Sequence, residues 1–217
     1  MTSTRREDQR QQRADTRQRI LEAASVLLEE RRWNELRLED VMAAAGLSRT
    51  VFYRHFDDRA TLLLAMLEEI LQHIGATGTA WKQGVGEPVS ALCTGLSELS
   101  EAMRKYGRLM QAIADTSAYD AETRTARAGL VQAFVTMTAD RIRADVDAGR
   151  SSVRDPWAVA DALVRMNESL LLDAFGHPPY PDPGDIARVM SEIWVCTIYG
   201  RPALDGLDAT ERPQRST

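Results

Sequence analysis

The sequence is poor in the residues that build metal centres and disulfides. Its 217 residues contain only two cysteines and three histidines. Cys93 and Cys196 lie far apart in the sequence, and no histidine stands near a cysteine or carboxylate at the spacing of a metal site or a catalytic triad. We therefore expect no metal, no cofactor and a pair of reduced, buried thiols.

Long apolar runs are also absent. No run approaches the length that crosses a bilayer, and the polar N-terminus lacks the apolar core of a secretion signal. We therefore expect a cytoplasmic protein with no membrane partner. There is no glycine-rich phosphate loop, and the acidic stretches Glu68-Glu69 and 145–147 read as solvated faces. These absences argue against an enzyme, which is the runner-up hypothesis.

Lysine is scarce, because 25 of the 27 basic residues are arginine. The net charge of −5 at first argues against a nucleic-acid partner. The charge is uneven, however, since residues 1–59 carry 12 basic and 11 acidic residues, whereas residues 60–217 carry 15 and 21. Residues 1–19 alone hold six arginines and three acids. Basic charge is therefore concentrated at the N-terminal end, where it can attract phosphates.

Residues 36–64 contain the most informative pattern, two short helices joined by a glycine turn. Good helix formers precede Gly46, which stands where a left-handed residue ends a helix. Ser48 is a good N-cap for the second helix, and Phe52 and Phe56, four residues apart, share its inner face. This is the helix-turn-helix arrangement, whose second helix enters the major groove of DNA.

The outward side chains of the second helix are of the kinds that contact DNA. Arg49 can donate two hydrogen bonds to a guanine, Thr50 can pair with several bases, and the methyls of Val51 can contact a thymine. Polar side chains further along suit phosphate oxygens, which fix register without reading sequence. These predicted phosphate ligands are Tyr53, Arg54, His55 and Arg59. Asp57 and Asp58 fall where the next helix begins and suit its cap. The alternative is a three-helix core whose basic face is only solvated.

These residues resemble the signature of the TetR family of one-component transcriptional regulators. The matching positions are Ala45-Gly46-Leu47-Ser48, Val51-Phe52-Tyr53-Arg54-His55-Phe56, Arg59 and Leu62-Leu63. The resemblance implies an all-α fold of about nine helices, three for DNA and six for a ligand pocket and a dimer interface. It implies base contacts from Arg49, Thr50, Val51 and Tyr53, and backbone contacts from Tyr53, His55 and Arg59. Arg37 replaces a capping Ser or Thr, so the cap is lost, although its side chain can still reach a phosphate. Val51 replaces a common Thr, which changes the operator sequence.

The chain divides into a small head and a larger second domain. We expect a disordered basic tail over residues 1–14, a helix-turn-helix DNA-binding domain over 15–74, a ligand-binding and dimerisation domain over 75–203 and a flexible tail over 204–217. Apolar periodicity predicts the first helix from about Asp15 to Arg31. A cluster of glycines after residue 74 marks the boundary between the domains.

Five helices are predicted in the second domain, at about 89–105, 108–115, 121–148, 156–175 and 183–199. The last two begin with an acidic cap and a proline, Asp155-Pro156 and Asp182-Pro183. The family resemblance implies that these two helices form a homodimer interface, since a two-fold symmetric operator needs two reading heads. The alternative is that both helices are interior to one subunit.

One polar residue interrupts the apolar stripe of the penultimate helix. Asn167 shares a face with Leu163, Val164, Leu170 and Leu171, where an unpaired carboxamide is costly. Its partner is a side chain, a water or a ligand, and the residues alone favour a structural partner.

A closer resemblance is to a mycobacterial branch of the same family, whose repressors hold elongated lipophilic ligands in a tunnel. It is carried by Arg165-Met166-Asn167-Glu168, Ala174-Phe175 and residues 193–200, together with the N-terminal motif. In that branch an asparagine anchors the ligand, and Asn167 matches it. The implied lining residues are Trp194, Phe134, Met137, Thr138, Leu99, Met103 and Leu92. Arg127, Leu92 and Leu99 stand where aromatics are usual, so the pocket is wider or partly filled by aliphatic side chains.

The predicted function is a repressor that binds a palindromic operator in double-stranded DNA as a homodimer and is released by a lipophilic small molecule. The effector displaces the helix over about residues 58–74, and the two heads move apart. A third possibility is a carrier of apolar ligands without regulation, which specific DNA binding would exclude. Whether the protein represses or activates depends on where its operator lies.

Overall fold

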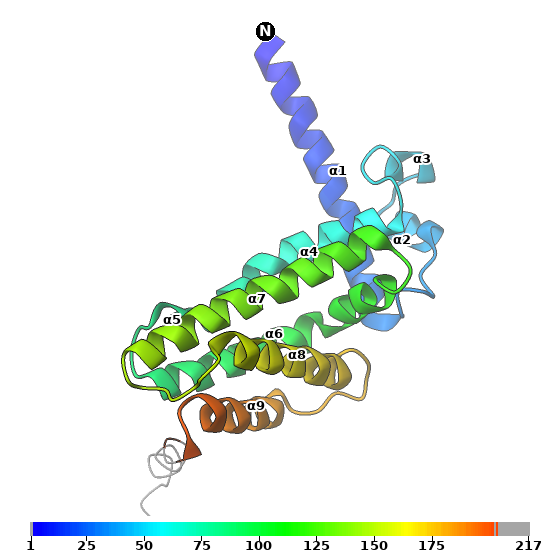
Figure 1. Cartoon of the computed structure of the whole chain (residues 1–217). Coiled ribbons are helices and arrows are strands. Elements are labelled where there is room, and N and C mark those ends of the chain that lie inside the picture. Colours follow the sequence, from blue (N-terminus) through cyan, green and yellow to red (C-terminus); the bar gives the residue numbers. More distant parts are fainter. Residues whose placement is uncertain (1, 202, 204–217) are drawn as a thin grey trace, which may run out of the picture. The chain divides into compact units, whose positions relative to one another are not determined.

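The computed structural model describes residues 2–201 and 203; the flexible tail expected over 204–217 lies outside them. Over this described part the chain is all-α, with nine helices and no strand, as the sequence predicts (Figure 1). The helices are α1 (Thr2–Glu30), α2 (Leu38–Ala44), α3 (Arg49–Phe52), α4 (Arg59–Ala76), α5 (Thr79–Gln83), α6 (Pro88–Thr116), α7 (Ala121–Asp147), α8 (Pro156–Phe175) and α9 (Pro183–Ile198). None of the helices described is both long enough and apolar enough to cross a membrane.

The chain forms two compact units. One comprises the described part of residues 1–70 together with 108–126, and the other comprises 71–107 and the described part of 127–217. The end of α6 and the beginning of α7 therefore group with the N-terminal helices, although sequence analysis assigns them to the second domain. Helices α4, α6 and α7 each begin in one unit and end in the other.

The core of the first unit comes from one face of each of its helices. Its fully buried large side chains include Ile20, Leu21, Leu36, Met42, Phe52, Leu62, Leu63 and Met66. The rings of Phe52 and Phe56 pack against each other at a tilt, with their centroids 5.4 Å apart, as the spacing of the two residues predicts. Asp58 caps α4 by accepting a hydrogen bond of 2.8 Å from the Thr61 backbone N–H, which confirms the predicted role of an acid at this helix start.

A glycine turn sets the angle between α2 and α3. Gly46 has φ +64°, the left-handed conformation that the sequence predicts. The Leu47 N–H donates to the Met42 carbonyl and the Gly46 N–H to the Ala43 carbonyl, so that the last carbonyls of α2 are satisfied. Arg19 of α1 also donates to the Ala45 carbonyl at 2.6 Å. The turn is therefore fixed both locally and by α1.

We expect Gly46→Ala to destabilise the protein by about 1–2 kcal/mol, the cost of a left-handed conformation for an L-residue. The added Cβ would also lie 3.3 Å from Nη2 of Arg19. Urea unfolding measures the effect as a lower midpoint at unchanged slope. Gly129→Ala is the matched control, because Gly129 lies in α7 with open space around its Cβ position, where alanine favours the helix. A midpoint for Gly46→Ala as high as that of the control would contradict the account of the turn.

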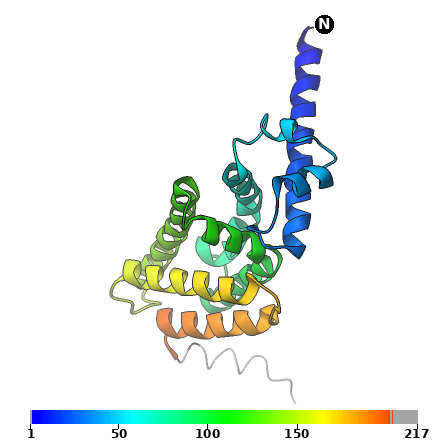
Figure 2. The same cartoon turned by 90° about the vertical axis from the view of Figure 1, so that its right-hand side faces the viewer.

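The second unit is built on α7, α8 and α9, and α8 and α9 lie side by side in both views (Figures 1 and 2). The predicted acidic caps are confirmed. Asp155 accepts from the Ala158 N–H at 3.0 Å, and Asp182 accepts from the Gly184 N–H at 2.7 Å. Neither Cys93 nor Cys196 is in a disulfide, but both are half-buried rather than buried.

Three helix boundaries differ from the sequence predictions. Helix α1 begins at Thr2 and so covers the segment expected to be a disordered tail, where Arg, Gln and Glu are good helix formers. A short α5 interrupts the expected loop after residue 74. The two helices predicted at 89–105 and 108–115 are one helix, α6. Gly107 does not break α6; its Cβ position lies 2.5 Å from the Phe175 carbonyl oxygen, so glycine permits a close approach there.

Candidate functional site

Helix α3 presents a polar face to solvent and an aromatic face to the core. Phe52 is fully buried, whereas Arg49, Thr50, Tyr53 and Arg54 are exposed. Val51 is half-buried beside them. The side chains predicted to read bases are thus brought together on one surface, as a recognition helix requires. Ser48 stands at the N-cap of α3 but makes no side-chain capping bond, contrary to its prediction.

Arg49 is held in place by two neighbours. Its Nη1 donates to Oε1 of Glu39 at 2.6 Å, and its Nη2 donates to the Tyr53 hydroxyl at 3.2 Å. The guanidinium also lies 5.8 Å from the centroid of the Tyr53 ring. A guanidinium has five N–H groups, so enough donors remain for a base edge. The contact with Glu39 could not be predicted from local spacing, because the two residues lie on different helices.

The other predicted phosphate ligands differ in their surroundings. Arg37 is exposed at the N-cap of α2 and makes no side-chain capping bond, as predicted. His55 is half-buried. Burial lowers the pKa of His55 and the nearby cations Arg13, Arg17 and Arg54 lower it further, so the neutral imidazole dominates at pH 7.

Arg59 turns inward. It donates to the Trp33 carbonyl oxygen through Nη2, and its guanidinium lies 4.8 Å from the centroid of the Trp33 ring. Burial lowers the pKa of Arg59. These contacts direct the Arg59 guanidinium toward Trp33, which sequence reasoning did not foresee.

In the second unit, Asn167 has a structural partner. The indole Nε1 of Trp194 donates to Oδ1 of Asn167 at 3.0 Å, and both side chains are buried. Trp194 also meets Trp81 edge to face, with ring centroids 6.0 Å apart. The partner is one of the residues expected to line the ligand tunnel. Trp81 was missed, because no periodicity in its short helix points to the core.

The remaining predicted lining residues are buried to different depths. Leu92, Met103 and Thr138 are buried, whereas Leu99, Phe134 and Met137 are half-buried. Lys82 Nζ lies 5.6 Å from the centroid of the Phe134 ring. Arg127, which replaces an aromatic, is paired with Glu168 at 2.9 Å and so ties α7 to α8.

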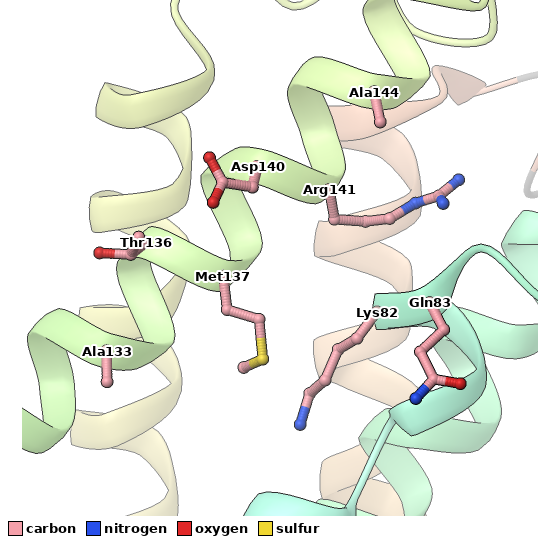
Figure 3. Close-up of a pocket in the computed structure, with 8 residues that line it drawn as sticks. All are labelled: Lys82, Gln83, Ala133, Thr136, Met137, Asp140, Arg141 and Ala144. Atoms are coloured by element: carbon pink, nitrogen blue, oxygen red, sulfur yellow. The ribbon is translucent and has the colours of Figure 1, made fainter.

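A cleft of about 670 Å³ opens between α5 and α7. It is lined by Lys82, Gln83, Ala133, Thr136, Met137, Asp140, Arg141 and Ala144 (Figure 3). Met137 belongs to the predicted ligand site, but Asn167 and Trp194 do not line this cleft. The Lys82 and Met137 side chains point toward one another across it. The cleft is therefore a different place from the region around Asn167.

A buried polar network lies behind the cleft. Asp145 is fully buried and accepts hydrogen bonds from Arg141, Arg150 and the Tyr199 hydroxyl, the last at 2.6 Å. Tyr199 in turn accepts from Trp81 Nε1 at 2.7 Å. Our reading of residues 145–147 as a solvated face was therefore wrong for Asp145. Its partners lie up to 54 residues away, beyond any local pattern.

Comparison with known proteins gives matches over both parts of the chain. Residues 20–66 match the family described as bacterial regulatory proteins, tetR family. Residues 92–200 match the C-terminal domain of the transcriptional regulator EthR. The families matched are families of transcriptional regulators, which are not enzymes.

The similarity extends to whole relatives. The HTH-type transcriptional regulator EthR of Mycolicibacterium smegmatis is 24% identical over 184 residues, which cover 83% of this chain and 85% of the relative. EthR of Mycobacterium tuberculosis is 26% identical over 185 residues, covering 83% and 86%. A transcriptional regulator from Rhodococcus sp. Rha1 has the same fold, with a TM-score of 0.68, 19% identity, and coverage of 82% and 95%.

Proposed function

Because this chain belongs to the TetR family of bacterial transcriptional regulators and carries an EthR-type C-terminal domain, we propose that it is a ligand-responsive repressor. It binds a palindromic operator as a homodimer, and a lipophilic small molecule releases it. The observation that carries the proposal is the exposed group Arg49, Thr50, Tyr53 and Arg54, which lies on α3 and the turn directly after it, where Phe52 and Phe56 are buried.

The DNA-binding part of the proposal rests on the geometry of the head. Arginine and threonine near the start of a recognition helix suit base edges, and Tyr53 and Arg54 suit phosphates. A dimer places two such heads on adjacent major grooves about 34–36 Å apart.

The dimer interface is assigned to α8 and α9. Trp157 on α8, and Val189 and Ile193 on α9, are large apolar side chains left exposed in the single chain. A second copy of these two helices would cover them. About a two-fold axis, the same surface patch of each subunit contacts that of the other.

The ligand part rests on the buried Asn167–Trp194 pair. An effector with a hydrogen-bonding group at one end and a long apolar body would compete for the Asn167 carboxamide and displace the Trp194 indole. Trp194 packs against Trp81 on α5, which directly follows α4. Because α4 begins at the head and ends in the second unit, a shift of α5 is transmitted along the chain to the head.

The effector acts only if it binds the released shape more tightly than the DNA-bound shape. A difference of about 1–3 kcal/mol weakens DNA binding about 5- to 150-fold. A gel shift with the region upstream of the protein's own gene tests the proposal, followed by addition of a lipophilic extract of the host. Retarded DNA that the extract releases is the expected result; no retardation of that region would refute the proposal.

Asn167→Leu is expected to abolish the response to the extract while DNA binding persists. The substitution removes the acceptor of the Trp194 N–H, which also costs about 1–3 kcal/mol of stability through the unsatisfied buried donor. The extract concentration that releases half of the DNA measures the response. Thr125→Ala is the control, because Thr125 is exposed on α7, outside the helices assigned to the dimer and to the effector contact, and its hydroxyl donates to the Ala121 carbonyl of the same helix. A normal response in the Asn167 variant would remove Asn167 from the effector site.

A further inference from the structure

The N-terminal half of α1 extends beyond the head. The helix has 29 residues, about 43 Å at 1.5 Å per residue. Its buried residues begin at Ile20, whereas residues 9–15 are all exposed. In both views this half of the helix projects past α3, within the same compact unit (Figures 1 and 2). The exposed residues of this extension contribute nothing to the core, so packing does not determine which side chains they carry.

One face of the extension is basic. Arg10, Arg13 and Arg17 are spaced three and four residues apart, so they fall within about 60° of arc on the helix. Asp15 points about 140–160° away from them and accepts a hydrogen bond of 2.8 Å from the Gln11 side chain. The acid therefore does not neutralise the arginine face.

This face lies beside the residues that follow α3. Nη2 of Arg13 donates to the Arg54 carbonyl oxygen at 3.2 Å, and the Arg17 guanidinium lies 5.5 Å from the centroid of the Phe56 ring. These contacts join positions about 40 residues apart in the sequence. They fix the register of α1 against the recognition helix, so Arg13 and Arg17 are held in place, and Arg10 lies on the same helix one turn before Arg13.

Among the side chains that the structure describes, positive charge is concentrated here with little compensation. Arg13, Arg17 and Arg54 all lie close enough to His55 to lower its pKa. The acid paired with Arg17 is Glu68, at 3.9 Å and with its side chain 77% exposed, so it is well solvated and screens the arginine weakly. Like charges gathered in this way repel one another unless an anion binds among them.

We propose that Arg10, Arg13 and Arg17 of α1 form a second DNA-backbone site, which binds phosphates flanking those contacted by α3. Guanidinium groups match phosphate oxygens in geometry and charge, and phosphate contacts position a protein without reading sequence. The site adds affinity and fixes the angle of the head on the duplex. The proposal rests on the proposed DNA-binding function and adds a ligand surface that the helix-turn-helix itself does not contain.

The test is the salt dependence of binding to a random-sequence duplex, measured by fluorescence anisotropy from about 50 to 200 mM salt. Arg10→Gln with Arg13→Gln is expected to reduce the slope of log K against log salt by about 0.9 for each lost phosphate contact. Arg143→Gln is the matched control, because Arg143 is an exposed arginine of the second unit; its slope should equal that of the wild type. Arg17 is left unchanged because of its contact with Phe56.

A second variant, with Arg10→Lys and Arg13→Lys, keeps the charge and should keep the slope. Circular dichroism of each variant establishes that α1 remains helical. An unchanged slope in the glutamine variant would overturn the proposal. The ratio of affinities for the upstream region and the random duplex should be the same in all variants. If the wild type shows no preference for the upstream region, the proposed repressor function fails, whereas the slope on random duplex still decides the role of α1.

Discussion

With Arg49 and Tyr53 both replaced by alanine, the protein is expected to lose its preference for its operator over random duplex. A bidentate arginine–guanine contact contributes about 1–3 kcal/mol of discrimination, and Tyr53 holds the Arg49 guanidinium through its hydroxyl. Binding of the effector should be unchanged, since both residues are exposed, Arg49 at the start of α3 and Tyr53 directly after it. Anisotropy titrations with both duplexes, and a thermal shift with the lipophilic extract, measure the two properties separately.

Two matched variants separate base reading from backbone binding. Arg54→Gln should weaken binding to operator and random duplex alike and lower the salt slope, because its predicted ligand is a phosphate. Glu39→Gln should strengthen binding to random duplex but relax the base preference, because it removes a negative charge and loosens Arg49. Equal losses on both duplexes for the Arg49/Tyr53 variant would show that these two residues contact the backbone and do not read bases.

The head was predictable because its signals are local. Gly46 ends a helix through its own conformational freedom, and Phe52 and Phe56 share a face through their spacing alone. These features need no knowledge of distant residues, and the family that they indicated is confirmed. The contacts of the individual DNA-facing residues remain predictions, and Arg59 shows the reason. Whether an arginine faces solvent or the Trp33 carbonyl depends on packing between segments 26 residues apart.

The helix boundaries were harder to predict, because they depend on contacts between residues far apart in the sequence or on small differences in helix propensity. Gly107 lies inside α6, and its neighbour across the fold is the Phe175 backbone, which no local pattern reveals. The extension of α1 to Thr2 follows from modest helix propensities summed over a polar segment, which a search for apolar periodicity overlooks.

The candidate ligand site was partly predictable for a related reason. A carboxamide in an apolar stripe must find a partner, so Asn167 could be singled out from its own helix. The identity of the partner could not, because Trp194 lies 27 residues away on α9. Trp81 and Asp145 were missed because each is buried by elements far away in the sequence.

Asp145→Ala is expected to give the largest loss of stability, about 3–5 kcal/mol, which is typical when one member of a buried ion pair is removed. The variant leaves the buried Arg141 without its partner and removes the acceptor of the Tyr199 hydroxyl. Urea unfolding at fixed protein concentration measures the loss. Asp140→Ala is the control on the same helix, because its pair with Arg143 is exposed to solvent and should contribute little.

A compensating variant tests the cause. If the loss comes from an unpaired buried cation, adding Arg141→Met to Asp145→Ala should restore part of the stability. If the double variant is less stable than Asp145→Ala alone, the loss comes instead from the cavity or from the hydrogen bonds to Arg150 and Tyr199.

The ionisation of Asp145 also predicts how the free energy of unfolding changes at acid pH. Burial on its own raises the pKa of Asp145, but the hydrogen bonds from Tyr199, Arg150 and Arg141 outweigh it, so the pKa lies below its ordinary value. A lowered folded-state pKa contributes stability that is complete above the unfolded value of about 3.9 and is lost as the pH falls through the folded value. The stability difference between wild type and Asp145→Ala should therefore be constant from about pH 7 to pH 5 and shrink below about pH 4. A difference that stays constant throughout acid unfolding would mean that Asp145 is not ionised in the folded protein.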